Sequence, residues 1–207
     1  LKEIKKTKKS LILSTGMATM DEIQKALRET QNYKKDNVGL LHCTSLYPAP
    51  IEKINLKSIS YMNKKFKTIV GYSDHVLGDK ASILAVASGA KIIEKHFTLD
   101  KKRKGFDHKI SLSPLEFKNM VSDIRKLEAI LGKEIKVPLD QELINKKNIE
   151  RYCVASKQIK VGQLLSINNI CFKRINMTGV ALKAYDFKKI SNKKAKKNYK
   201  KNQIIEV

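Results

Sequence analysis

The fold class follows from residues 68–96, which read TIVGYSDHVLGDKASILAVASGAKIIEKH. A short apolar segment, Thr68–Tyr72, precedes a helical segment that stops at Gly89, and a second apolar segment, Lys91–His96, follows. An apolar strand, a helix and another apolar strand are typical of a βα unit in a parallel sheet. The stretch therefore predicts an α/β fold with parallel strands.

The same pattern continues on both sides of this stretch. Upstream, strands are expected at Leu11–Ser14 and Val38–Cys43, each followed by a helical segment. Thr19 and Glu22 form a capping box that predicts the start of the first of these helices. Downstream, Ser113–Glu116 combines an N-cap serine, a proline and a capping glutamate, which predicts a helix that Gly132 ends. Four βα units can be counted in residues 1–132. This segment is therefore expected to form one α/β domain around a parallel sheet.

The character of the chain changes after this point. Residues 133–150 are polar and contain one proline, which indicates an interdomain linker. Residues 151–207 hold short β-like segments, such as Tyr152–Ala155 and Ile170–Phe172, separated by turns. We expect a small β-rich module there, near the lower size limit for independent folding.

Composition excludes several classes of protein. No apolar run approaches the roughly 20 residues that cross a bilayer, and no signal peptide is recognisable. We therefore expect a cytoplasmic protein without membrane contact. Cys43, Cys153 and Cys171 lie far apart and form no CxxC pair, which argues against a disulfide framework or a zinc knuckle.

The net charge of +23 arises from 43 basic and 20 acidic residues and favours association with phosphates. The lysines are spread over the whole chain without interleaved aromatic residues, so we expect no specific nucleic-acid partner. One alternative class stays open, a basic polyanion-binding module without catalysis that uses the lysine-rich residues 188–201. That function predicts salt-dependent nucleic-acid binding that survives His75→Ala and His96→Ala.

Two histidines, His75 and His96, end consecutive predicted strands. The carboxyl ends of parallel strands form the binding edge of such folds, so the two imidazoles are expected to be neighbours that could share a metal. Imidazole with oxygen donors suits manganese, cobalt or zinc better than calcium. A structural role for each histidine is the alternative. His42, inside an apolar strand, is expected to be a core histidine.

Polar residues on the same edge could contact a substrate. Asp107 follows the fourth strand and could hold a hydroxyl or accept a proton. An Asx-type turn after Gly105 is its alternative role. Ser14, Thr15, Ser45 and Ser73 lie at strand ends and offer hydroxyls to an oxyanion.

Four motifs in this order and spacing strongly resemble the N-acetylneuraminate (sialic acid) synthase family of nonulosonate synthases. They are Leu41–Pro48 (LHCTSLYP), Gly71–His75 (GYSDH), Glu94–Leu99 (EKHFTL) and Gly105–Lys109 (GFDHK).

The resemblance extends over the whole chain. The tail from Arg151 onward resembles the family's small antifreeze-like (SAF) domain, including Lys173–Arg174 followed by Gly179. The resemblance implies that residues 1–132 are the C-terminal half of a TIM (β/α)8 barrel, strands five to eight. A closed eight-stranded barrel needs ~250 residues, and four βα units cover about half of one. The chain departs from the family pattern at Val76, Phe106 and Ile175.

The resemblance implies condensation of phosphoenolpyruvate with an N-acetylmannosamine-type sugar to give a nonulosonic acid and phosphate. His75 and His96 would hold a divalent metal, typically Mn²⁺, with Mg²⁺ or Co²⁺ as alternatives. A legionaminate or pseudaminate synthase is the alternative within the class. The other implied contacts are Ser14, Ser45 and Ser73 for phosphoenolpyruvate, and Tyr47 and Asp107 for the amino sugar.

Family members are domain-swapped homodimers, so Arg174 would reach the N-acetyl group of the sugar in the partner subunit. The first half of the barrel supplies a lysine pair and a glutamate in the family. These residues are absent from the 207-residue chain, and we expect the chain alone to be inactive.

Overall fold

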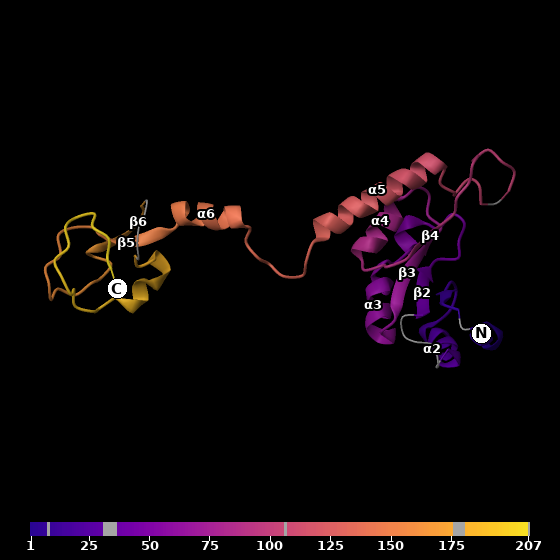
Figure 1. Ribbon diagram of the computed structural model, residues 1–207, viewed down its shortest axis with the longest axis horizontal. Coiled ribbons are helices and arrows are strands. Elements are labelled where there is room, and N and C mark those ends of the chain that lie inside the picture. Colours follow the sequence, from indigo (N-terminus) through magenta and orange to yellow (C-terminus); the bar gives the residue numbers. More distant parts are fainter. Residues whose placement is uncertain (8, 31–36, 106, 176–180, 207) are drawn as a thin grey trace. The chain divides into compact units, whose positions relative to one another are not determined.

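The computed structural model describes residues 1–7, 9–30, 37–105, 107–175 and 181–206. It divides into two compact units, Leu1–Lys133 and Glu134–Val207 (Figure 1). Phe106 and Gly179, which the sequence comparison singled out, lie outside the described residues.

The first unit contains one parallel sheet with the strands in chain order. The strands are β1 (Leu11–Ser14), β2 (Val38–Cys43), β3 (Ile69–Asp74) and β4 (Ile93–Lys95). The helices that follow them are α2 (Met20–Glu29), α3 (Lys57–Phe66), α4 (Lys80–Ala87) and α5 (Pro114–Leu131), with a short α1 (Lys2–Lys6) and a 3-10 turn η2 (Ile51–Lys53). The predicted α/β half-barrel is confirmed.

The bounds of β3 and β4 differ from the predicted Thr68–Tyr72 and Lys91–His96. β3 continues to Asp74, because Ser73 and Asp74 pair in register with Glu94 and Lys95 of β4. Neighbouring side chains of a strand point to opposite faces. Ser73 and Asp74 therefore point to opposite faces of the sheet, and Asp74 bonds Ser82 on α4.

Both predicted capping boxes are present. The Glu22 carboxylate accepts from the Thr19 N–H at 2.7 Å at the start of α2. At the start of α5, the Glu116 carboxylate accepts from the Ser113 N–H at 2.7 Å. Each box satisfies main-chain donors that the first helical turn leaves free.

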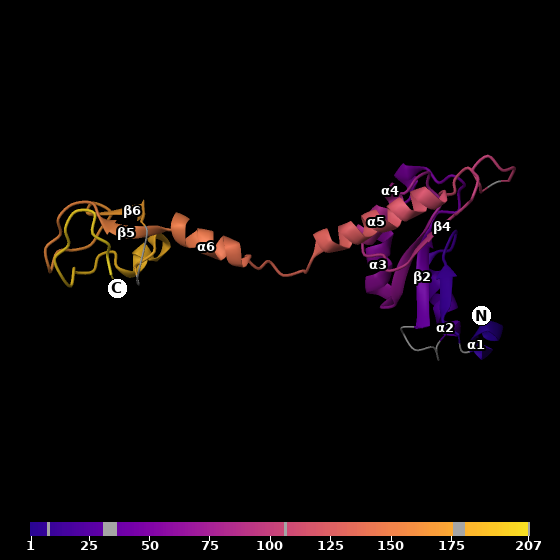
Figure 2. The same ribbon diagram turned by 45° about the horizontal axis from the view of Figure 1, so that its top comes forward.

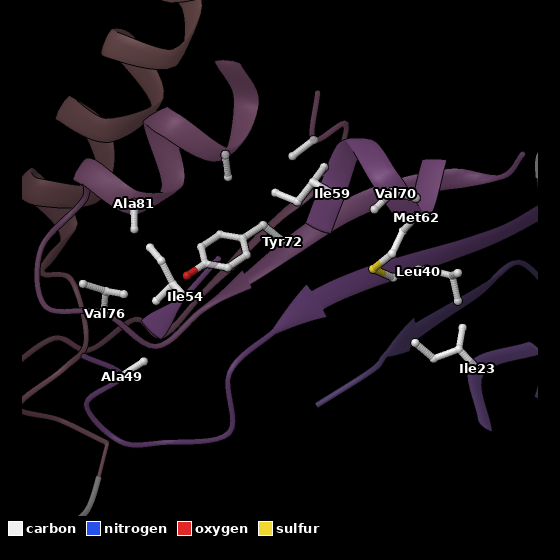
Figure 3. Close-up of a cluster of buried hydrophobic side chains, with 12 residues drawn as sticks. Ile23, Leu40, Ala49, Ile54, Ile59, Met62, Val70, Tyr72, Val76 and Ala81 are labelled. Atoms are coloured by element: carbon white, nitrogen blue, oxygen red, sulfur yellow. The ribbon is translucent and has the colours of Figure 1, made fainter. Parts of the chain in front are cut away.

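Helices α3, α4 and α5 lie on one side of the strands (Figure 2). The core fills the layer between this face and the helices, and Tyr72 lies at its centre among Ile54, Val76 and Ala81 (Figure 3). The opposite face carries Ile12, which is 54% exposed. One face of the sheet is therefore covered by helices, and the opposite face is exposed at Ile12 on β1 and buried at Leu41 on β2.

The second unit contains helix α6 (Asp140–Ile149), an antiparallel pair of strands and a 3-10 helix, η3 (Ala184–Lys189). The strands are β5 (Arg151–Ala155) and β6 (Ile170–Arg174). A separate apolar core forms around Cys153, Ile159 and Ile205. The segment expected as a linker thus contains a helix, none of whose residues is buried.

None of the described helices combines the length and the apolarity that crossing a membrane requires.

Candidate functional site

An open cavity of about 490 Å³ lies at the carboxyl ends of the four parallel strands. It is lined by Ser14, Thr15, Gly16, Met17, Cys43, Ser45, Tyr47, Ser73, His75, Glu94 and His96. Six of the eight residues to which the resemblance assigns a contact lie on this lining. Asp107, in the same unit, does not, and Arg174 belongs to the second unit.

His75 follows β3 directly and is almost fully buried, with 6% of its surface exposed. Its Nδ1 lies 2.8 Å from the main-chain oxygen of Thr44. A carbonyl oxygen can only accept, so Nδ1 carries the proton and Nε2 of the neutral ring keeps its lone pair. This is the arrangement in which a histidine binds a metal through Nε2.

His96 follows β4, and its ring centroid lies 5.3 Å from that of His75. The Tyr47 ring stacks on His75 at 4.2 Å and meets His96 edge-on at 5.8 Å. The two histidines predicted to be neighbours are therefore brought together, and the aromatic ring of Tyr47 contacts both.

The donor set of this cavity fits a divalent transition metal. Two imidazoles with open coordination positions suit Mn²⁺, Co²⁺ or Zn²⁺. Within the described part of the chain, no group of three or more His, Cys, Asp or Glu side chains is arranged to hold an ion.

The Glu94 carboxylate faces the cavity and was not predicted from the sequence. The Ser73 hydroxyl donates to it at 2.6 Å, across the β3–β4 register. Glu94 could have been identified from the alternation of side chains along a strand. Its neighbour in β4, Lys95, points to the opposite face of the sheet. A carboxylate and a hydroxyl thus lie beside the histidine pair.

The loop after β1 adds Thr15, whose hydroxyl the sequence placed at this edge, and Gly16, which the sequence did not indicate. The Gly16 N–H donates to the Cys43 sulfur at 2.9 Å, and Gly16 has a φ of +34°. The Thr15 hydroxyl donates to the Leu41 carbonyl at 2.8 Å. Gly16 could have been identified from its place directly after a strand, at the binding edge of the sheet.

Asp107 lies near the cavity without lining it. One carboxylate oxygen is 3.8 Å from His96 Nδ1, and the side chain is 56% exposed. Its main-chain oxygen accepts from the N–H groups of Ile110 and Ser111. The turn is thus made by the main chain of Asp107, and its carboxylate faces His96.

Arg174 ends β6 in the second unit and is exposed. His42, by contrast, is a satisfied structural histidine, as predicted, because its Nε2 lies 2.7 Å from the Ile54 carbonyl oxygen.

The electrostatic surroundings keep the Tyr47 hydroxyl protonated. Desolvation raises the pKa of Tyr47, and the nearby Cys43, Asp107 and Glu94 add to the shift. Neutral tyrosine is both a donor and an acceptor. Tyr47 therefore offers a hydrogen-bond donor to a ligand throughout the physiological pH range.

The chain matches known proteins over nearly its whole length. It is 43% identical over 207 residues to the N,N'-diacetyllegionaminic acid synthase of Campylobacter jejuni, covering 99% of this chain and 61% of that protein. It is 41% identical over 197 residues to a pseudaminic acid synthase of Campylobacter jejuni, covering 95% and 56%. The chain thus spans about three-fifths of the length of these curated relatives.

A solved structure shows the same architecture. The N-acetylneuraminic acid (sialic acid) synthetase of Leptospira borgpetersenii superposes with a TM-score of 0.66 at 37% identity, over 72% of this chain and 52% of that chain. The model of the NeuB family matches residues 1–136, which contain every residue of the cavity. The chain belongs to the NeuB family.

Proposed function

We propose that this chain forms the metal- and sugar-binding half of a nonulosonic acid synthase, which condenses phosphoenolpyruvate with an N-acetylated amino sugar. The observation that carries the proposal is the convergence of His75, His96 and Tyr47 around one cavity, with ring centroids 4.2–5.8 Å apart. The legionaminic and pseudaminic acid synthases among the relatives support the same chemistry.

The reaction balances with one water molecule. The C3 carbon of phosphoenolpyruvate forms a bond to the aldehyde carbon of the open-chain sugar, and water adds at C2. The C2–O bond then breaks and inorganic phosphate leaves. The product is a nine-carbon 2-keto acid.

The two histidines would hold a divalent metal, Mn²⁺ foremost, with Mg²⁺ and Co²⁺ as alternatives. When bound, such an ion polarises the aldehyde oxygen of the sugar toward attack. His75 is already in the tautomer that this role needs, since its Nδ1 proton is bonded to Thr44.

The hydroxyls of Ser14, Ser45 and Ser73 would donate to the phosphate and carboxylate oxygens of phosphoenolpyruvate. All three line the cavity. Ser73 donates to Glu94 in this structure and would have to turn its proton toward the substrate. The lysine pair and the glutamate of the family's first barrel half would complete this part of the site.

Tyr47 and Asp107 would hold the amino sugar. Tyr47 supplies a protonated hydroxyl beside His75, and the exposed carboxylate of Asp107 faces His96. Asp107 could accept a hydrogen bond from a sugar hydroxyl or take up a proton. Arg174 would act in trans, from the SAF-type module of the second subunit in a domain-swapped homodimer.

A chimera tests the function. In the Campylobacter jejuni N,N'-diacetyllegionaminic acid synthase, this chain would replace the matching 61%. We expect phosphate release from phosphoenolpyruvate that requires both Mn²⁺ and an acetamido sugar. Assays with N-acetylmannosamine and with the six-carbon diacetamido sugars of the legionaminate and pseudaminate series then identify the product.

Two variants and one control separate the metal ligands from other histidines. His75→Ala and His96→Ala are each expected to lower the rate by at least ~100-fold, because ligand loss removes the charge that stabilises the transition state. His42→Gln keeps a donor to Ile54 outside the cavity and should remain active. Full activity in either alanine variant would contradict the assignment.

A further inference from the structure

Asp74 and Lys95 lie directly before the two cavity histidines in the sequence. The Lys95 ammonium is 3.1 Å from the Asp74 carboxylate, and both side chains are completely shielded from solvent. They lie on the face of the sheet opposite Ser73 and Glu94, so neither contacts the cavity.

The ion pair holds the main chain on both sides of His75. The Asp74 Oδ1 accepts from the Val76 N–H at 2.8 Å, and Oδ2 accepts from the Ser82 hydroxyl at 2.6 Å. The Lys95 ammonium donates to the main-chain oxygen of Val76. Both polar main-chain groups of Val76 are therefore bonded to the pair.

The consequence is a fixed link between the ends of β3 and β4. His75 lies between Asp74 and Val76, both of which are held, and Lys95 is covalently joined to His96. The His75 carbonyl also accepts from the Ala49 N–H at 2.9 Å. A shift of one strand end relative to the other would break several buried hydrogen bonds at once.

Stability alone does not account for such a pair. Removing two charges from water costs several kcal/mol per ion, and well-packed apolar residues of similar volume are often equally stable. An apolar pair, however, could not bond Val76. The geometry is thus suited to positioning.

We propose that the buried Asp74–Lys95 pair is a positioning device that fixes the separation and orientation of His75 and His96 and thereby sets the metal affinity of the cavity. This inference rests on the proposed function, because it assigns the two histidines to one metal ion. Asp74 and Lys95 are positioning residues and touch no substrate.

The test measures Mn²⁺ binding to the purified protein from the EPR signal of the free aqueous ion. Lys95→Met is expected to raise the Mn²⁺ dissociation constant about 10-fold or more, since loss of groups that orient metal ligands costs 10–100-fold in affinity. The double variant Asp74→Leu/Lys95→Met removes the uncompensated charge. It should melt at a higher temperature than Lys95→Met while its Mn²⁺ affinity stays low.

The controls separate positioning from folding and from the proposed function. Arg125→Met removes the cation of an exposed ion pair on α5 and should leave the Mn²⁺ affinity unchanged.

Recovery of wild-type affinity in the double variant would overturn the inference, because affinity would then follow stability alone. Wild-type affinity in Lys95→Met with loss of binding in His75→Ala would overturn this inference only. Unchanged binding in His75→Ala would overturn the metal site itself.

Discussion

At the scale of single residues, the contacts of His75 determine what the cavity can bind. Thr44 fixes its tautomer, and the Tyr47 ring covers one of its faces. An offset or stacked aromatic contact contributes about 0.5–1.5 kcal/mol beyond area burial. Tyr47 can therefore serve the site through its ring as well as through its hydroxyl.

Substitutions at Tyr47 separate these two contributions. Tyr47→Ala removes the stacked ring and should raise the Mn²⁺ dissociation constant about 2- to 10-fold, which corresponds to the stacking energy. Tyr47→Phe keeps the ring and should bind Mn²⁺ as the wild type does, while the chimera loses affinity for the sugar. EPR titration and sugar KM measure the two effects. Equal metal binding in both variants would show that the stacking does not matter.

At the scale of elements, the start of α5 is joined to the loop after β4 by an ion pair. The Lys101 ammonium lies 2.6 Å from the Glu116 carboxylate. This bond to Lys101, followed by the bonds to Ser113, lowers the pKa of Glu116 from 4.5 to about 2. The lowered pKa makes the stability of the helix start dependent on pH.

The sign of this dependence follows from the direction of the shift. A carboxylate with a lowered pKa in the folded state stabilises the fold above pH 4.5 and loses this contribution as the pH falls toward 2. Glu116→Gln keeps the capping box and removes the charge. Urea unfolding should show the wild type more stable at pH 7, with a difference that shrinks between pH 4.5 and 2.

The side chain of Glu116 is 45% exposed, so salt should also reduce the difference. A difference that stays constant across this pH range would contradict the ion-pair contribution of Glu116.

Within the sheet, Gly71 is required for close packing on the face opposite the helices. A Cβ at this position would meet the main-chain oxygen of Ile92 and the Leu41 side chain. Gly39 is the matched control, since a Cβ there would first meet a movable side-chain end, Ile92 Cδ1 at 3.1 Å. Gly71→Ala should lower the free energy of unfolding by about 3 kcal/mol or more, and Gly39→Ala by about 1 kcal/mol. Equal losses in urea unfolding would contradict this packing.

The sequence predicted those elements whose sequence patterns lie within a few neighbouring residues. The capping boxes at Thr19 and Ser113 depend on residues three positions apart, so they are readable without knowledge of the fold. The end of β3 and the orientation of Glu94 depend on pairing with a strand about 20 residues away in the chain, which no local pattern records. The neighbouring placement of His75 and His96 was predictable because parallel strands share one binding edge.

At the scale of the whole molecule, the two units have separate apolar cores. The second unit, residues 134–207, buries Cys153, Ile159 and Ile205 completely. Strand β5 pairs with β6, and its residues Tyr152 and Val154 also form bridges to Lys183 and Ile204 of the same unit. Its stability should therefore depend little on the barrel half.

Expression of residues 134–207 alone tests this independence. We expect dispersed amide resonances and a cooperative thermal transition. Ile159→Ala, at a fully buried position, should lower the free energy of unfolding by about 2–5 kcal/mol. Val161→Ala, at a 60% exposed position, should have little effect. A broad transition with collapsed resonances would show that the unit needs the rest of the chain.

The central claim is that His75 and His96 hold one divalent metal at the carboxyl end of the half-barrel. Pulsed EPR of the Mn²⁺-loaded protein tests it directly, because the method counts nitrogen atoms bound to the ion. The account predicts two imidazole nitrogens in the wild type and one in each of His75→Ala and His96→Ala. A spectrum without bound nitrogen, or one that neither substitution changes, would contradict it.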